Sequence, residues 1–128
     1  MKYEILIADD DRDFVTVLKE RLESSGFITD CAYEGVRTIE LAHKKKPDLI
    51  LLDWKMPAGG ASTVLQYLKE KPETKNIPVI VITGVADNFL ESKAASLGAK
   101  YFIRKPYDPH LLIDTINEIL ALRTEKSK

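Results

Sequence analysis

Several polar residues stand out in this chain because they lie where short apolar runs end. The runs cover residues 5–8, 49–52, 79–82 and 101–103, and the polar residues that follow them include Asp9, Asp10, Asp11, Asp53, Thr83 and Lys105. Short runs rich in β-branched residues, separated by helix-length segments, are typical of parallel strands buried on both faces. The carboxyl ends of such strands share one edge of the sheet, where ligands bind. The sequence therefore predicts that carboxylates, a hydroxyl and an ammonium group converge on one small pocket.

Carboxylates gathered in such a pocket would repel one another. At a separation of ~5 Å and an effective dielectric constant of ~20, each pair of charges costs about 3 kcal/mol. The pocket must therefore keep one carboxyl group protonated or bind a cation. Oxygen ligands without a histidine or thiol nearby suit Mg²⁺, which keeps part of its water shell for a phosphate-bearing partner.

A structural role is the alternative for each of these residues taken singly. An acidic residue after a strand commonly caps the next helix, and one residue of the Asp9–Asp11 triplet is expected to do so. One cap accounts neither for the rest of the triplet nor for Asp53. Thr83 alone is an ordinary strand-end residue, and Lys105 alone is an ordinary surface residue before a turn. Only their combination at successive strand ends is specific.

Amphipathic segments with helical spacing fill the gaps between the strands. The apolar residues expected on the buried helix faces are Phe14, Val17, Leu18 and Leu22; Val36, Ile39 and Ala42; Val64, Leu65 and Leu68; Phe89, Leu90, Ala94 and Leu97; and Leu112, Ile113, Ile116, Ile119 and Leu120. The fourth helix is expected from about residue 87 to residue 97. The fifth is expected to open with Asp108 as its cap and Pro109 at its first position. With a second strand over residues 28–32, five strands alternate with five helices.

This alternation predicts an α/β fold, a doubly wound five-stranded parallel sheet with five helices on its two faces. In the flavodoxin-like strand order 2-1-3-4-5, the strands that end at Asp9 and at Asp53 are neighbours at the point where the chain order reverses. The chain shows no internal repeat and no linker-like segment. We therefore expect one domain over residues 1–124, with residues 125–128 as a frayed tail.

The composition of the chain argues against several classes of function. Hydrophobic residues make up 45% of the chain, charged residues make up 30%, and the formal net charge is −1, which argues against nucleic-acid binding by bulk electrostatics. The single cysteine, Cys31, cannot form an intrachain disulfide and is expected to be a small core residue. The lysine cluster at residues 44–46 is interpreted as a solvated helix end. Without a secretory segment or a run of about 18 apolar residues, the sequence predicts a cytoplasmic protein with no membrane partner.

Taken together, these motifs resemble the receiver domain of two-component response regulators, the CheY-like family. The resemblance rests on I-L-I-A-D-D-D (residues 5–11), D-L-I-L-L-D-W-K-M-P (48–57), P-V-I-V-I-T-G (78–84) and G-A-K-Y-F-I-R-K-P-Y-D (98–108), and it covers essentially the whole chain. It implies a CheY-like fold and a phosphorylation-controlled switch rather than a metabolic enzyme. Only stoichiometric self-phosphorylation and slow autodephosphorylation would then be expected.

The resemblance also implies a role for each matching residue. Asp53 is similar to the phosphoacceptor. Asp10 would bind Mg²⁺ directly, Asp9 would bind it mainly through water, and Asp53 and the backbone carbonyl of Lys55 would complete the protein ligands. The residues similar to the phosphoryl-binding and switch groups are Thr83, Lys105 and Phe102, and a cis peptide is expected between Lys105 and Pro106.

The partners implied by the family are a histidine kinase or phosphotransfer protein and a downstream protein or output domain. The response surface would comprise the fourth helix, the fifth strand and the fifth helix, and a homodimer through that face is one expectation. Direct nucleic-acid binding is not expected.

Three positions depart from the usual pattern of the family. Phe102 stands where tyrosine is commoner, so this side chain would rotate without a hydroxyl tether; a plain core role is its alternative. The loop at residues 58–61 has two glycines where an acidic residue and one glycine are usual, which suggests a mobile loop. Val85 cannot position an attacking water, and Lys55 offers only a charge, so we expect a comparatively long-lived acyl phosphate.

A second reading comes from the enzyme class. The chain resembles Mg²⁺-dependent aspartyl-phosphate hydrolases of the dehalogenase-like kind in having an acidic strand end, a threonine and a lysine. In such enzymes the nucleophile lies on the first strand in a D-x-D motif, a spacing that Asp9 and Asp11 show here. The hydrolase hypothesis leaves Asp53 unexplained. Such enzymes also have a cap insertion that encloses the substrate, and the sequence does not contain one. The hypothesis that the chain binds a flavin or a nucleotide has still less support, because no Gly-rich loop follows the first strand.

Overall fold

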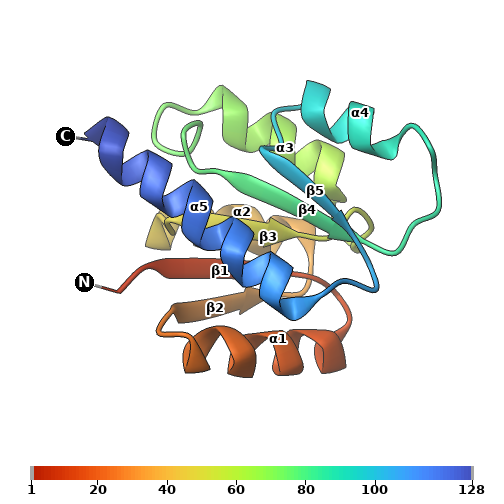
Figure 1. Ribbon diagram of the computed structural model, residues 1–128. Helices are drawn as coiled ribbons and strands as arrows, with labels where there is room; N and C mark the ends of the chain where they lie inside the picture. Colours follow the sequence, from red (N-terminus) through yellow and green to blue (C-terminus); the bar gives the residue numbers. More distant parts are fainter. Residues whose placement is uncertain (1, 128) are drawn as a thin grey trace.

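A computed structural model of the protein describes residues 2–127, with side chains described through residue 123. Five strands form one parallel sheet: β1 (Glu4–Ala8), β2 (Ile28–Ala32), β3 (Leu49–Leu52), β4 (Val79–Thr83) and β5 (Tyr101–Arg104). Their order is β2-β1-β3-β4-β5, with all four neighbouring pairs parallel (Figure 1). The predicted doubly wound α/β fold and strand order are confirmed.

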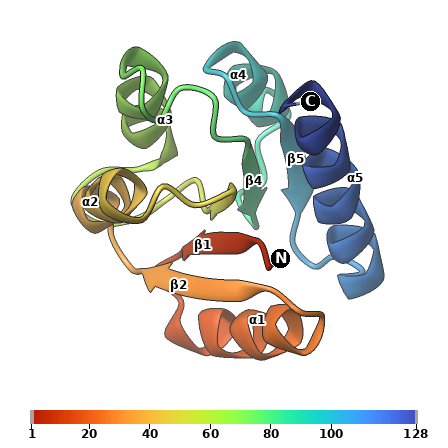
Figure 2. The same cartoon turned by 90° about the vertical axis from the view of Figure 1, so that its left-hand side faces the viewer.

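Five helices cover the two faces of the sheet. They are α1 (Arg12–Ser24), α2 (Gly35–Lys45), α3 (Ala61–Glu70), α4 (Leu90–Ser96) and α5 (Pro109–Ser127). Helices α1 and α5 lie on one face, and α2, α3 and α4 lie on the other (Figure 2). Every residue of β3 and β4 is buried, because these strands have helices on both sides. The resulting two apolar clusters, one on each face, hold the strand ends in fixed positions.

The helix faces differ in detail from the prediction. Val17, Val36 and Phe89 were expected in the core but are 60%, 52% and 80% exposed. In α1 the apolar stripe includes Val15 instead of Val17, because spacing alone does not choose between two overlapping stripes. Helix α4 begins at Leu90, three residues later than expected, so Phe89 precedes it. Cys31 is half-buried on the edge strand β2.

Two aspartates begin helices as predicted. The carboxylate of Asp11 accepts a hydrogen bond of 3.1 Å from the backbone amide of Phe14 at the start of α1. The carboxylate of Asp108 accepts one of 2.9 Å from the amide of His110 at the start of α5. Side-chain oxygens thereby satisfy amide groups that have no partner within the helix. One residue of the acidic triplet is therefore a helix cap.

Helix α2 begins without a side-chain cap and uses the neighbouring loop instead. The amides of Gly35 and Val36 donate to the carbonyls of Pro57 and Ala58, both at 3.0 Å. A Cβ atom on Gly35 would lie 2.1 Å from the backbone oxygen of Gly59, so only glycine fits there. The glycine-rich loop was predicted to be mobile; the structure shows that its backbone is hydrogen-bonded to α2.

Helix α5 extends beyond the predicted end of the domain. Residues 125–127, expected to fray, form its last turn, since the sequence has no glycine or proline there to stop the helix. Lys128 lies outside the described residues. Within residues 2–127, no helix is long and apolar enough to cross a bilayer.

Candidate functional site

Three carboxylates meet at the carboxyl edge of the sheet. Asp9 and Asp10 follow β1, and Asp53 follows the adjacent strand β3. One carboxylate oxygen from each of the three lies within 4.8 Å of the others. Asp9 is only 2% exposed, Asp53 is half-buried and Asp10 is exposed. The structure therefore brings together the carboxylates that were predicted to converge.

The Asp53 carboxyl group is the most perturbed group of the site. Its own burial, and then repulsion from Asp9, raise its pKa from 3.8 to about 6. The Lys105 ammonium, the Thr83 hydroxyl and the amide of Trp54 act in the opposite direction on this pKa. The Trp54 amide donates a 2.8 Å hydrogen bond to Asp53 Oδ1. The negative charge of Asp53 is thus incompletely compensated at neutral pH.

Lys105 pairs with Asp9. Its Nζ lies 2.8 Å from Asp9 Oδ2 and 3.9 Å from the centre of the Phe14 ring. The other oxygen of Asp9 accepts a 2.9 Å hydrogen bond from the backbone amide of Asp11. The Lys105–Pro106 peptide is cis, as the family resemblance implied. The ammonium is thereby held inside the site by an almost fully buried carboxylate.

Thr83 contributes a buried hydroxyl at the end of β4. Thr83 is 0% exposed, and its Oγ1 accepts a 3.2 Å hydrogen bond from the backbone amide of Val85. A hydroxyl that accepts this bond still has its own proton to donate. This hydroxyl is one of the groups that lower the pKa of Asp53.

Phe102 and Arg104 lie on β5, beside the loop that joins β4 to α4. Phe102 is half-buried and packs against the cluster of apolar residues on the α2–α3–α4 face. The guanidinium of Arg104 lies 5.1 Å from the centre of the Phe102 ring. It donates to the carbonyls of Val85 at 3.0 Å and Asp87 at 2.9 Å, which fastens the loop to β5. The sequence carries no signal for this role of Arg104, because its partners are backbone carbonyls.

Lys55 lies in the loop after β3, with an exposed side chain. The same loop is fixed where the amide of Ala61 donates a 3.0 Å hydrogen bond to the carbonyl of Trp54. Asp11, in contrast, is outside the carboxylate group and caps α1. The site therefore contains Asp9, Asp10 and Asp53, but not the D-x-D pair of the alternative reading.

The donor set of the site fits a hard divalent cation. It consists of oxygen atoms at one sheet edge, and the ammonium of Lys105 pairs with one of these carboxylates, Asp9. Oxygen-only sites with one or two directly bound carboxylates are typical for Mg²⁺. A bound cation would also remove the repulsion between Asp9 and Asp53.

Comparison with known proteins assigns the family. The profile of the response regulator receiver domain matches residues 5–117. The polar-differentiation response regulator DivK of Brucella anthropi is 30% identical over 121 residues, covering 94% of this chain and 98% of that protein. The signal receiver domain of a signal transduction histidine kinase from Syntrophus aciditrophicus is similar in structure, with a TM-score of 0.86, 30% identity and coverage of 93% of this chain and 90% of that chain. A CheY-like receiver domain protein from Methanospirillum hungatei gives a TM-score of 0.91 and 25% identity, over 98% of this chain and 99% of that chain. This chain therefore belongs to the receiver domains of two-component response regulators.

Proposed function

We propose that Asp53 accepts a phosphoryl group from a histidine kinase or phosphotransfer protein, in the presence of Mg²⁺. The phosphorylated domain then controls a downstream protein or an output domain through the surface of α4, β5 and α5. The observation that carries this proposal is the grouping of the Asp53 carboxylate with Asp9 and Asp10, within 4.8 Å, beside Thr83 and Lys105. As a class, receiver domains are phosphorylatable switches rather than metabolic enzymes, and they interact with histidine kinases and downstream partners.

The proposed Mg²⁺ ligands are Asp9, Asp10, Asp53 and the backbone carbonyl of Lys55. The ion would supply positive charge to offset the charge that develops on the phosphoryl oxygens. The buried Asp9 and the half-buried Asp53 favour this role, because Lys105 compensates their mutual repulsion only in part when no divalent cation is bound.

The chain's own groups provide positioning and charge for the transfer. A carboxylate oxygen of Asp53 attacks phosphorus, and the bond from phosphorus to the donor's imidazole nitrogen breaks, with its electron pair remaining on that nitrogen. The ammonium of Lys105, held 2.8 Å from Asp9, is close enough to the site to pair with a phosphoryl oxygen. The Thr83 hydroxyl has a proton available to donate to another.

The proposed switch links Thr83 to Phe102. If the hydroxyl moves toward the phosphoryl group, space opens behind it and the half-buried Phe102 ring turns inward. Because Arg104 lies over this ring and holds the β4–α4 loop, the loop would rearrange in the same step. Changing an inactive ensemble (1:99) into an active one (99:1) requires about 5.5 kcal/mol. A few charge-assisted hydrogen bonds of ~1.5–3 kcal/mol each supply that amount.

The acyl phosphate is proposed to be long-lived. Val85 has no polar side-chain atom to hold a water molecule, and its amide is already bonded to Thr83. Decay of the phosphorylated protein, followed by intact mass spectrometry, measures this lifetime. A decay rate among the fastest of receivers would contradict the proposal.

Incubation with acetyl phosphate and Mg²⁺ tests the proposed function against the hydrolase reading. A receiver gains at most one phosphoryl group per chain and releases inorganic phosphate slowly. A hydrolase of the dehalogenase-like kind would release many equivalents and would depend on Asp11. Unchanged phosphate release in Asp53→Asn, together with its loss in Asp11→Asn, would overturn the proposal.

A further inference from the structure

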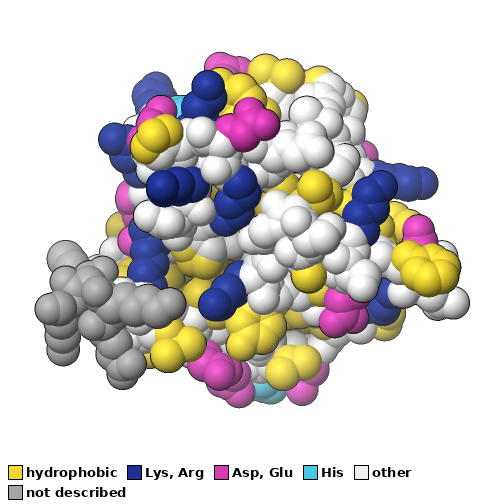
Figure 3. Space-filling model, turned by 90° about the horizontal axis from the view of Figure 1, so that it is seen from above, with side chains coloured by type: hydrophobic (Ala, Val, Ile, Leu, Met, Phe, Trp, Pro, Cys, Tyr) yellow, Lys and Arg dark blue, Asp and Glu magenta, His cyan; other side chains and the backbone are white. Residues whose placement is uncertain are grey.

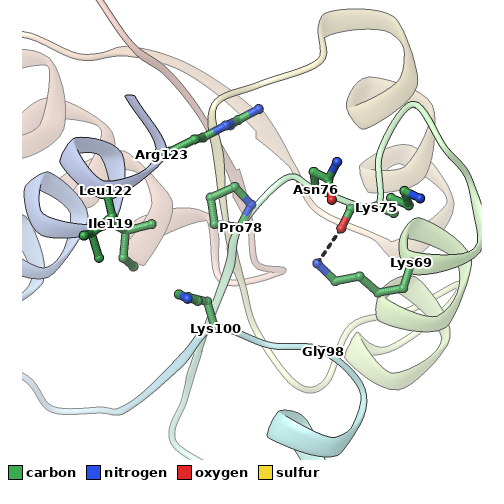
Figure 4. Close-up of a pocket in the computed structure, with 9 residues that line it drawn as sticks. All are labelled: Lys69, Lys75, Asn76, Pro78, Gly98, Lys100, Ile119, Leu122 and Arg123. Carbon is green, nitrogen blue, oxygen red and sulfur yellow. Dashed lines mark hydrogen bonds between the residues drawn. The ribbon is translucent and has the colours of Figure 1, made fainter. Parts of the chain in front are cut away.

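A second recess lies at the opposite edge of the sheet from the carboxylates. It has a volume of about 630 Å³, and its walls come from the end of α3, the segments just before β4 and β5, and α5 (Figure 4). Among its lining residues are Lys69, Lys75, Lys100, Arg123, Pro78 and Ile119. Strands of four or five residues, at about 3.3 Å per residue, place this recess about 15 Å from the acidic site. The two sites are therefore separate.

The recess is strongly cationic in a protein whose formal net charge is −1. Of the lining residues whose side chains the structure describes, four are lysine or arginine and none is acidic. Lys and Arg side chains gather on the left half of the face shown in Figure 3. Among the described side chains, no carboxylate lies within 4.0 Å of the ammonium of Lys69, Lys75 or Lys100. Three lysine charges with no carboxylate partner among the described side chains attract anions.

Lys69 forms a fixed wall of the recess. Its Nζ donates to the carbonyls of Lys75 at 3.1 Å and Ile77 at 3.2 Å, which leaves one ammonium hydrogen for a ligand. Its alkyl chain crosses Gly98, where an added Cβ would lie 2.9 Å from Lys69 Cε. Burial lowers the pKa of Lys69, a cost that a bound anion would offset. The wall is thus preorganised rather than a set of flexible side chains.

Stability of the fold accounts for only part of this cluster. Lys69 is in the last turn of α3, where a cation favours the helix dipole, and Arg123 donates to the carbonyl of Asp48. Lys75 and Lys100 are exposed, one in the loop before β4 and the other just before β5. Neither makes a side-chain hydrogen bond or ion pair among the described residues. Their placement beside Lys69 and Arg123 is left unexplained by the fold.

We propose that this recess binds a small phosphate-bearing molecule with an apolar or planar part, of about nucleotide size. The volume lies within the range of small-molecule sites. Lysine and arginine are the usual phosphate-binding side chains, and Pro78 and Leu122 offer apolar surface for the rest of the ligand. A recess of about 630 Å³ lined by several separate segments favours a small molecule over a protein surface.

The experiment is an NMR titration of the ¹⁵N-labelled full chain in EDTA at physiological ionic strength. The probes are ADP, inorganic pyrophosphate and adenosine, and the reporters are the backbone amides of Asn76, Gly98 and Lys100. The amide of Trp54 reports separately on the acidic site. We expect saturable shifts at the recess with ADP, weaker binding of pyrophosphate, no binding of adenosine and no shift at Trp54.

Matched variants separate the recess from general surface charge. Lys75→Gln combined with Lys100→Gln is expected to weaken ADP binding at least tenfold. Lys44→Gln combined with Lys45→Gln removes the same charge from the end of α2 and is expected to leave binding unchanged. Phosphoryl labelling of Asp53 is expected to survive in both pairs, so a failure here is distinct from a failure of the proposed function.

Three results would overturn the proposal. One is that no phosphate-bearing probe gives saturable shifts at the recess. Another is that both variant pairs weaken binding equally, which indicates diffuse electrostatic attraction. The third is that a Glu-rich peptide binds at these amides while ADP does not, which indicates a protein-docking surface.

Discussion

Replacing Asp53 with asparagine should stabilise the protein when no divalent cation is present. The carboxylate is half-buried, lies beside the buried Asp9, and has its pKa raised from 3.8 to about 6. Asparagine has nearly the same shape and keeps an oxygen that accepts the hydrogen bond from the Trp54 amide. The variant therefore removes a charge that lowers the free energy of unfolding, and it does so without creating a cavity.

The size and pH dependence of this effect follow from the pKa. The increase of the Asp53 pKa from 3.8 to about 6 corresponds to a destabilisation of the wild type by at most about 3 kcal/mol. Because this group is half-exposed, solvent screening reduces the expected destabilisation to about 1–2 kcal/mol. The folded protein retains the proton up to about pH 6, whereas the unfolded chain loses it near pH 3.8. The destabilisation of the wild type therefore grows as pH rises from 4 to 6 and is complete above pH 7. Below about pH 4 the two proteins should be equally stable.

Urea denaturation in EDTA at pH 4.5, 6.0 and 7.5 measures the difference in the free energy of unfolding. For a 128-residue domain, 1–2 kcal/mol corresponds to a rise in Tm of about 4–8 °C at pH 7.5. Asp114→Asn, an exposed change on α5, is the control and should have little effect. Excess Mg²⁺ should stabilise the wild type more than the variant, by about 2.7 kcal/mol at 100 times the Kd if only the wild type binds. A variant less stable than the wild type in EDTA at pH 7.5, or a difference that does not change with pH, would refute the reasoning.

Four further predictions concern single residues of the site and its supporting loop. Lys105→Met should lower the free energy of unfolding by about 2–3 kcal/mol in urea titrations, because it leaves the 2%-exposed Asp9 carboxylate without its cation; an unchanged midpoint in EDTA would contradict this. Gly35→Ala should cost about 2 kcal/mol in the same assay, since its Cβ would lie 2.1 Å from a backbone oxygen of the loop after β3; full retention of stability would show that this loop moves freely. Trp54, the single tryptophan, should change its fluorescence as Mg²⁺ binds, because its amide is bonded to Asp53. Asp10→Ala should shift that titration to higher Mg²⁺, and an identical curve would remove Asp10 from the proposed ligand set.

The sheet could be predicted from the sequence because burial on both faces leaves little freedom in residue type. The all-buried runs of β3 and β4 predict strands directly, and the order of the strands followed from the flavodoxin-like arrangement of doubly wound folds. Helix faces were less certain, because α1 and α2 carry more apolar residues than one stripe needs. Val17 and Val36 fit the helical spacing as well as the residues that are buried, and both are exposed. Only packing against the sheet decides between such stripes.

At the site, the sequence indicated which groups meet but not how they pair. It placed Lys105 near three carboxylates, and only the structure shows that its hydrogen-bonded partner is Asp9. The hydrogen bonds of Arg104 to the β4–α4 loop are made to backbone carbonyls, which every residue type has, so the sequence does not predict them. The basic recess escaped prediction for another reason: its cations come from three separate stretches of the chain, at residues 69–75, 100 and 123. The lysine cluster that the sequence does show, at the end of α2, is a helix terminus.

The central claim is that the Asp53 carboxylate, charged and grouped with its neighbours at the sheet edge, is the group that accepts phosphate. Intact mass spectrometry after treatment with acetyl phosphate and Mg²⁺ tests this most directly. The wild type should gain the mass of one phosphoryl group, Asp53→Asn should gain none, and Asp10→Ala should recover labelling only at high Mg²⁺. The same mass gain in Asp53→Asn as in the wild type would contradict the account.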